Sequence, residues 1–155
     1  PYTTLFRSAC AKLSRVKMAT RTQARGAVVE LLYAFESGNE EIKKIASSML
    51  EEKKIKNNQL AFALSLFNGV LEKINEIDAL IEPHLKDWDF KRLGSMEKAI
   101  LRLGAYEIGF TPTQNPIIIN ECIELGKLYA EPNTPKFLNA ILDSLSKKLA
   151  QKPLN

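Results

Sequence analysis

Apolar residues recur every three or four positions along most of the chain, which is the spacing that places them on one face of an α-helix. The longest such segment, residues 60–81, keeps close to a seven-residue period. We therefore expect it to form the central helix of a bundle. Helices are predicted for residues 21–37, 40–52, 60–81, 95–108, 117–130 and 134–152.

Turn-forming and capping residues mark the ends of several predicted helices. Gly38 follows the first one, where glycine commonly terminates a helix. Ser95 and Thr134 stand where a side-chain oxygen would cap a helix amino end, and Pro135 suits the first position of the last helix. Residues 110–116 form the clearest loop, because two prolines and several small polar residues fall within them.

The isoleucine run 117–119 is the segment whose composition favours a strand. The run continues into the helical spacing of Ile123 and Ala130, and no second strand is predicted with which it could pair. Helix is therefore our interpretation, and the predicted fold class is all-α with about six to seven helices.

Pro83 and the mixed stretch 84–94 separate the predicted helices into two groups. We expect two packed helical subdomains, residues 18–82 and 83–155. Residues 1–17 have no orderly helical stripe and end just before a methionine that reads as an initiation site. We interpret them as a cloning scar or leader rather than a native basic arm, and charges interrupt every apolar run that a signal peptide would need.

The composition is that of a globular protein with its own core. Hydrophobic residues make up 45% of the chain and charged residues 26%, which is typical of neither a disordered nor a membrane-spanning protein. The two cysteines are Cys10 and Cys122, so the part beyond residue 17 has one thiol and no internal disulfide. A reducing cytoplasm is the expected location.

The net charge of +4 and the pI near 9.1 suggest a polyanionic partner, but the excess charge lies in one place. The first 17 residues contain no acidic residue and four basic residues, Arg7, Lys12, Arg15 and Lys17. Taking these four from the 22 basic residues leaves 18 against 18 acidic ones in the rest of the chain. Nucleic-acid binding by that part must depend on where its charges stand.

The sequence contains no signature of an enzyme. His84 is the only histidine and has no partner at metal-ligand spacing, so no zinc site is predicted. Cys122 lies in an apolar helical stripe, where a buried thiol is expected rather than a nucleophile. Carboxylate pairs such as Glu121 and Glu124 are expected on solvated faces, and no phosphate loop or nucleophile elbow occurs. We predict no catalysis, cofactor or metal.

Two groups of residues are candidates for RNA binding. Arg21 and Arg25 stand four residues apart, so we expect them to project from one face at the start of the first helix, within reach of a phosphate. The second group combines aromatic, amide and cationic side chains, which can stack on unpaired bases and hydrogen-bond to their edges. It consists of Tyr129, Asn133, Lys136 and Phe137. Taken alone, this second group is better explained by packing.

Several sequence blocks resemble the NusB family of transcription antitermination factors. They run in the family's order over the whole chain from Met18, and the last three together are highly specific. The blocks are Ala24-Arg25 with Leu32-Tyr33, Glu97 to Arg102 with Tyr106-Glu107, Ile119-Asn120-Glu121 with Glu124-Leu125 and Lys127, and Lys136 to Asn139 with Leu142-Asp143. The resemblance implies an all-helical fold of two subdomains, the same as that predicted from periodicity.

The resemblance also implies a function. Proteins of this family bind the boxA element of ribosomal RNA leader transcripts together with NusE, a small-subunit ribosomal protein. The complex joins NusA, NusG and RNA polymerase so that elongation resists termination. Bacterial cytoplasm is the location that this role implies.

Carried over position by position, the resemblance assigns RNA phosphates to Arg21 and Arg25 and RNA bases to Phe137. Glu97 and Arg102 match charged positions on the side linked to RNA and partner engagement. The complete set of predicted RNA-binding residues is Arg21, Arg25, Tyr33, Glu97, Arg102, Tyr129, Asn133, Lys136 and Phe137.

The basic arm is thin here, because Thr20, Thr22 and Gln23 stand where some relatives have arginines. We therefore expect weak RNA binding by the chain alone and a larger gain from NusE. Two alternatives stay open: a helical scaffold in ribosome biogenesis without sequence-specific RNA recognition, and a homodimer as well as a monomer. A fused RNA methyltransferase is disfavoured, since no glycine-rich methyl-donor motif occurs.

Overall fold

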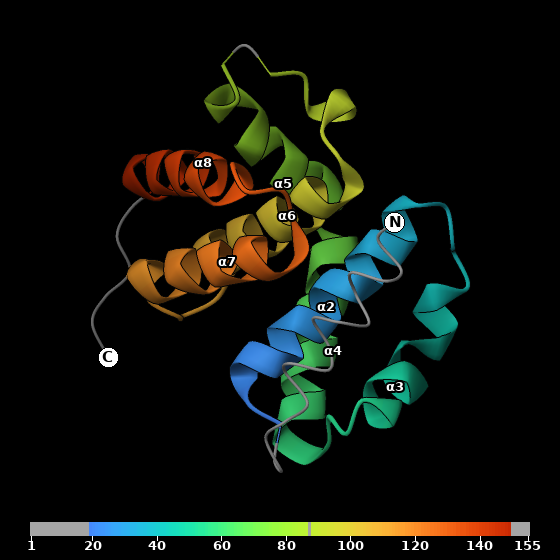
Figure 1. Ribbon diagram of the computed structural model, residues 1–155. Coiled ribbons are helices and arrows are strands. Elements are labelled where there is room, and N and C mark those ends of the chain that lie inside the picture. The colour runs from blue at the N-terminus through green and yellow to red at the C-terminus, as the bar shows by residue number, and fades with distance from the viewer. Residues whose placement is uncertain (1–18, 87, 150–155) are drawn as a thin grey trace.

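The computed structural model describes residues 19–86 and 88–149, and within these ranges all regular structure is helical (Figure 1). The predicted all-α fold is confirmed. The described elements are α2 (Arg21–Glu36), α3 (Ile42–Glu52), α4 (Asn57–Glu72), α5 (Ile74–Ile81), the 3-10 helices η1 (Glu82–His84) and η2 (Phe90–Arg92), α6 (Ser95–Phe110), α7 (Asn115–Tyr129) and α8 (Thr134–Lys148).

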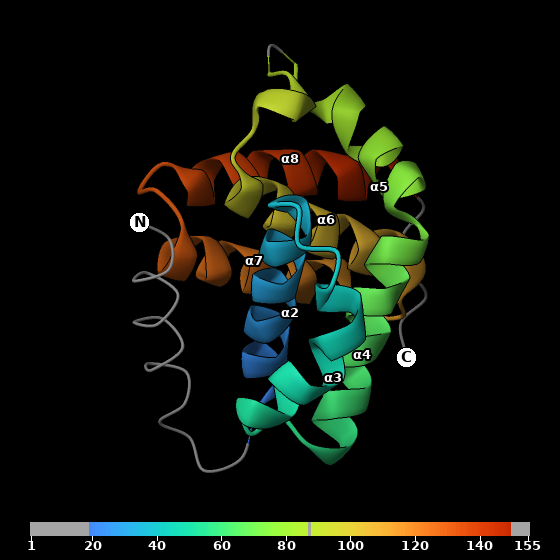
Figure 2. The same cartoon turned by 90° about the vertical axis from the view of Figure 1, so that its right-hand side faces the viewer.

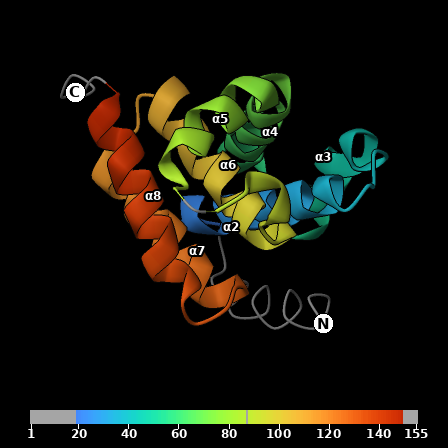
Figure 3. The same ribbon diagram turned by 90° about the horizontal axis from the view of Figure 1, so that it is seen from above.

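Helix α6 is the centre of the molecule. It packs against α2 and α4 on one side, against α7 and α8 on another, and against α5 (Figures 1 and 2). Ten of its residues are buried, including the unbroken run 99–105. A helix that is buried on most of its sides must be covered by neighbours, and five helices pack on this one. Figure 3 shows α7 and α8 along one flank and α3 on the other.

Small residues bring the helices close to α6. A Cβ atom added to Gly104 would lie 2.9 Å from the Cys122 sulfur and 3.0 Å from two methyl carbons of Leu142. Glycine at this position therefore allows α7 and α8 to pack tightly on the same turn of α6.

Helix α6 contacts helices from both of the subdomains predicted from the sequence. The division of the chain between residues 82 and 83 stays a prediction.

The prediction of one helix over residues 60–81 is wrong. The segment is divided at Lys73, where α4 ends and α5 begins, and the Lys73 backbone has left the helical region with φ −110° and ψ 22°. The division allows Ile77 and Ile81 to be buried while α5 packs on α6. Periodicity does not reveal this break, since the apolar spacing continues through it.

Helix ends also differ from the predictions. Ser95 and Thr134 are the first helical residues, and the capping positions belong to Gly94 and Asn133. In contrast, Thr20 caps α2 through a reciprocal pair of hydrogen bonds with Gln23, at 3.1 Å and 2.8 Å. Thr20 and Gln23 therefore stabilise the start of α2. The isoleucine run 117–119 is helical, as predicted.

Candidate nucleic-acid interface

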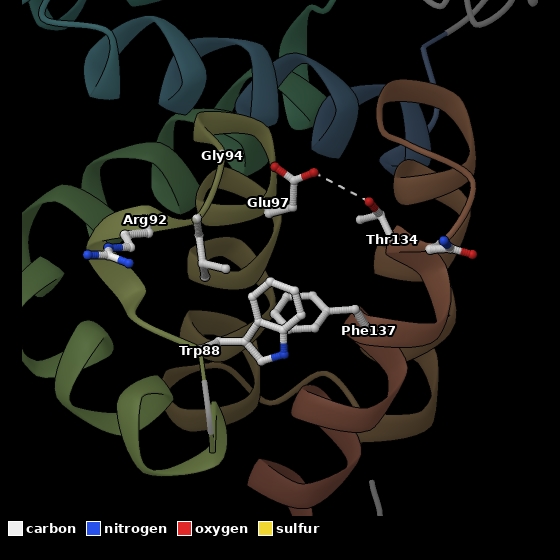
Figure 4. Close-up of a pocket in the computed structure, with 8 residues that line it drawn as sticks. Trp88, Arg92, Gly94, Glu97, Thr134 and Phe137 are labelled. Carbon is white, nitrogen blue, oxygen red and sulfur yellow. Dashed lines mark hydrogen bonds between the residues drawn. The ribbon is translucent and has the colours of Figure 1, made fainter.

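A pocket of about 340 Å³ opens where the amino ends of α6 and α8 meet the loop around η2. Figure 4 shows side chains from all three segments around it. Its lining residues are Trp88, Arg92, Leu93, Gly94, Glu97, Asn133, Thr134 and Phe137. The volume falls at the lower end of the range for ligand pockets, roughly 300–1,000 Å³, so the pocket suits a ligand of nucleobase or nucleoside size.

Two aromatic rings form one wall of the pocket. The ring centroids of Trp88 and Phe137 are 5.5 Å apart and their planes meet at 64°, an edge-to-face contact (Figure 4). Trp88 is 63% exposed, although large aromatic side chains usually bury most of their surface. An exposed, supported ring is a surface on which an unpaired base can stack.

Polar groups stand beside the aromatic wall. The Thr134 hydroxyl donates to Glu97 Oε1 at 3.3 Å, and this hydrogen bond links α8 to α6 across the pocket (Figure 4). Thr134 is buried, whereas Asn133 is exposed. The pocket therefore offers acceptor oxygens from a carboxylate and both donor and acceptor atoms from an amide.

A buried cluster supports the loop that carries Trp88 and Arg92. Phe90, only 7% exposed, lies beneath two cations, with Lys98 Nζ 5.5 Å and Arg102 Cζ 5.3 Å from its ring centroid. Lys98 also donates to the Lys91 carbonyl oxygen at 3.4 Å. Three contacts thus hold η2 against α6.

Arg102 is the centre of that cluster. Its guanidinium donates to both carboxylate oxygens of Asp78 at 2.9 Å and to Glu36 at 2.7 Å, while Lys98 donates to Glu36 at 3.0 Å. Burial acts to raise the pKa of Glu36, but the hydrogen bonds and charges of Arg102 and Lys98 outweigh it and lower the pKa. Arg102 therefore joins α2, α5 and α6 behind the pocket, and is itself buried.

Arg25 does not project to the surface, contrary to the prediction. It is 2% exposed and donates to both carboxylate oxygens of Glu107, at 2.8 Å and 2.9 Å. Burial acts to lower the pKa of Arg25, but these hydrogen bonds and the charges of Glu107 and Glu121 outweigh it and raise the pKa. Thr22 donates to Glu121 at 3.0 Å, so the amino end of α2 is tied to both α6 and α7.

Arg21 is exposed, with its guanidinium carbon 4.4 Å above the ring centroid of Phe62. Among the other predicted residues, Tyr129 is fully buried and Tyr33 is half-buried against the core, while Lys136 is exposed on α8. A fully buried ring cannot stack on a base, so Tyr129 is a packing residue. The nine predicted residues thus do not form one surface.

The structure brings three of the predicted residues, Glu97, Asn133 and Phe137, into one pocket. Sequence reasoning missed Trp88 and Arg92. The available signal for Trp88 was a single tryptophan standing among charged residues, where no buried helical stripe accounts for it.

The two side chains considered as catalytic candidates, Cys122 and His84, lie in surroundings typical of structural residues. Cys122 is fully buried, and burial, followed by the charge of Glu107, raises the pKa of its thiol, so the thiol is protonated at neutral pH. His84 Nδ1 lies 2.8 Å from the Ser144 hydroxyl, and burial together with Lys148 lowers its pKa. Across residues 19–86 and 88–149, no three side chains group as metal ligands and no helix is long and apolar enough to span a membrane.

Comparisons with family models, with known sequences and with solved structures all relate this chain to NusB proteins. Residues 22–147 match the NusB family. The chain is 99% identical to the transcription antitermination protein NusB of Helicobacter pylori (strain G27) over 138 residues, which is 89% of this chain and 100% of that protein. It is 61% identical to the NusB protein of Helicobacter hepaticus over 131 residues, covering 84% of this chain and 83% of the relative.

Solved structures show the same fold. A crystal structure of the antitermination factors NusB and NusE in complex with double-stranded RNA matches with a TM-score of 0.76 and 30% identity, covering 83% of this chain and 97% of that one. NusB of T. maritima matches with a TM-score of 0.75 and 30% identity, over 86% and 94% of the two chains. The chain belongs to the NusB family of transcription antitermination proteins, which are noncatalytic.

Proposed function

We propose that this chain is an RNA-binding antitermination factor that recognises boxA-type RNA of ribosomal RNA leader transcripts together with NusE. The observation that carries the proposal is the pocket in which exposed Trp88 and half-buried Phe137 stand beside Glu97 and Asn133. It is further supported by the similar NusB fold crystallised with NusE and double-stranded RNA.

The proposed contacts differ in kind. An unpaired base stacks on one ring of the Trp88–Phe137 pair and packs edge-on against the other, because the two planes meet at 64°. Asn133 hydrogen-bonds to a base edge. Exposed Arg21 and Lys136 attract phosphates. Tyr33 on α2 contributes a further RNA contact. Arg25 and Arg102 affect RNA binding only indirectly, because their charges are already paired with carboxylates inside the protein.

Among the described residues, the proposal assigns phosphates to the two exposed cations Arg21 and Lys136, so we expect modest affinity for RNA alone. Each phosphate contact contributes about one unit to the slope of log affinity against log salt concentration. NusE is therefore proposed to supply further contacts. Linkage then requires RNA to strengthen NusE binding by the same factor.

The wider assembly follows from the family role. We infer that the RNA-bound pair joins NusA, NusG and RNA polymerase in the bacterial cytoplasm. A homodimer that covers the RNA surface would compete with this assembly, and sedimentation at several protein concentrations tests it. A concentration-independent monomer would remove the dimer from the proposal.

The direct test is a titration of the full chain with a boxA-type RNA and a scrambled RNA of equal length, each with and without NusE. We expect tighter binding to the boxA-type RNA and a larger difference when NusE is present. Equal affinities for both RNAs in both conditions would favour the alternative, a helical scaffold without sequence-specific RNA recognition.

A further inference from the structure

We propose that Glu97 makes the pocket selective for guanine, by accepting two hydrogen bonds from the Watson–Crick edge of a base stacked on the Trp88–Phe137 wall. This inference rests on the RNA-binding function proposed above and adds the identity of the base. The juxtaposition that carries it is a carboxylate and two aromatic rings lining one pocket of about 340 Å³.

A carboxylate is an unexpected group in a pocket that faces RNA. Its charge repels phosphates, so its presence weakens binding unless the ligand presents hydrogen-bond donors to it. The hydrogen bond that Glu97 accepts from a side chain of the described residues comes from the neutral Thr134 hydroxyl. One hydroxyl leaves most of the acceptor capacity of two oxygens unused.

The position of the carboxylate is set by its neighbours. In Figure 4 it lies above the paired rings, between Gly94 and Thr134. A Cβ atom on residue 94 would collide with Glu97 Oε2, so glycine there makes room for the carboxylate. Thr134, the first residue of α8, holds the other oxygen. The two oxygens are thus placed from both sides of the pocket.

The donor pattern of the four bases then decides which one fits. Guanine presents the N1–H and N2–H₂ donors side by side, which match two carboxylate oxygens as a bidentate pair. Cytosine and adenine place one amine next to a ring nitrogen acceptor, which the second oxygen repels. Uracil places its N3–H between two carbonyl oxygens. Guanine is therefore the only base of the four that offers two adjacent donors to Glu97.

The test uses short oligouridine RNAs that carry one guanosine, adenosine, cytidine or uridine at the centre. Trp88 is the only tryptophan of the chain, so its fluorescence reports a base stacked in this pocket. We expect the guanosine RNA to quench Trp88 and to bind on the order of tenfold tighter than the other three, the discrimination typical of a good bidentate contact.

Three variants separate the carboxylate from its surroundings. Glu97→Gln should remove the guanosine preference while RNA binding persists. Gly94→Ala should weaken the preference by displacing the carboxylate, because residue 94 has φ −62°, a conformation that alanine adopts freely. Glu124→Gln removes an equal charge from an exposed ion pair with Lys127 on α7, and should keep the preference.

The results that would overturn guanine selectivity alone differ from those that would overturn RNA binding itself. If all four RNAs bind and quench Trp88 equally, the chain binds RNA but Glu97 does not read guanine. A preference for adenosine, cytidine or uridine, or a guanosine preference retained in Glu97→Gln, also overturns the inference. If neither these RNAs nor a boxA-type RNA bind with or without NusE, the proposed function fails and the inference fails with it.

Discussion

The amino end of α2 and the pocket beside α8 both carry residues that the sequence assigns to RNA, but the fold uses them differently. At the α2 end, Arg25 is 2% exposed and its charge is paired with Glu107. At the pocket, Trp88 is 63% exposed and stands in edge-to-face contact with Phe137. A cationic residue type alone therefore does not identify a phosphate contact, because the same guanidinium can join two helices inside the protein.

The largest effect is expected where Arg25 is replaced by alanine. Arg25→Ala leaves the buried Glu107 carboxylate without its bidentate partner, which should lower the free energy of unfolding by about 3–5 kcal/mol. Chemical denaturation measures the change. Arg21→Ala is the matched control, because Arg21 is exposed, and it should change stability by less than about 0.5 kcal/mol. Equal stability of the two variants would show that Arg25 does not tie α2 to α6.

Phe137→Ala should have the next largest effect, on RNA rather than on folding. Loss of one base-stacking ring should weaken binding of a boxA-type RNA by about 1–3 kcal/mol. Fluorescence anisotropy of labelled RNA measures the affinity, and circular dichroism checks that the variant is folded. Phe35→Ala on α2, which removes a half-buried ring outside the pocket, is the control. Unchanged RNA affinity in folded Phe137→Ala would remove this ring from the site.

Acidification should destabilise the cluster behind the pocket by a smaller amount. The folded-state pKa of Glu36 is lowered, so its contribution to stability is present above its unfolded-state pKa, about 4.3, and is lost as pH falls through the folded-state pKa. Glu36→Gln should therefore reduce stability at pH 7 and flatten the fall at low pH. Glu41→Gln, at an exposed pair with Lys44, should leave the profile as in the wild type. Identical profiles for all three proteins would contradict the Glu36 assignment.

The smallest effect is expected for Arg21 in RNA binding. Arg21→Ala should reduce the slope of log affinity against log salt concentration by about one unit, for boxA-type and scrambled RNA alike. Lys44→Ala on the exposed face of α3 should leave the slope unchanged. Affinities measured at several salt concentrations compare the two variants. A wild-type slope in Arg21→Ala would show that this residue makes no phosphate contact.

Helical periodicity predicted most of the elements because burial of one face is a local property of the sequence. The break at Lys73 was not predictable in this way, since Ile77 and Ile81 keep the apolar spacing beyond the point where α4 ends. Helix caps were harder still: Thr20 caps α2 with its hydroxyl, whereas Thr134 turns its hydroxyl to Glu97.

The functional surface was predictable only in part for a related reason. Arg25 and Glu107 are 82 residues apart, so no local pattern reveals that one neutralises the other. Trp88 lies outside every predicted helix. It becomes a candidate for RNA binding only because the fold brings its ring into contact with Phe137. Residue type and spacing identify candidates, and burial decides which of them can meet a ligand.

The central claim is that RNA binds at the Trp88–Phe137 wall, and Trp88 fluorescence during a titration with boxA-type RNA in the presence of NusE tests it most directly. We predict saturable quenching whose midpoint matches the affinity measured by anisotropy of the labelled RNA. RNA binding of normal affinity with no change in Trp88 fluorescence would contradict the claim and place the RNA elsewhere on the molecule.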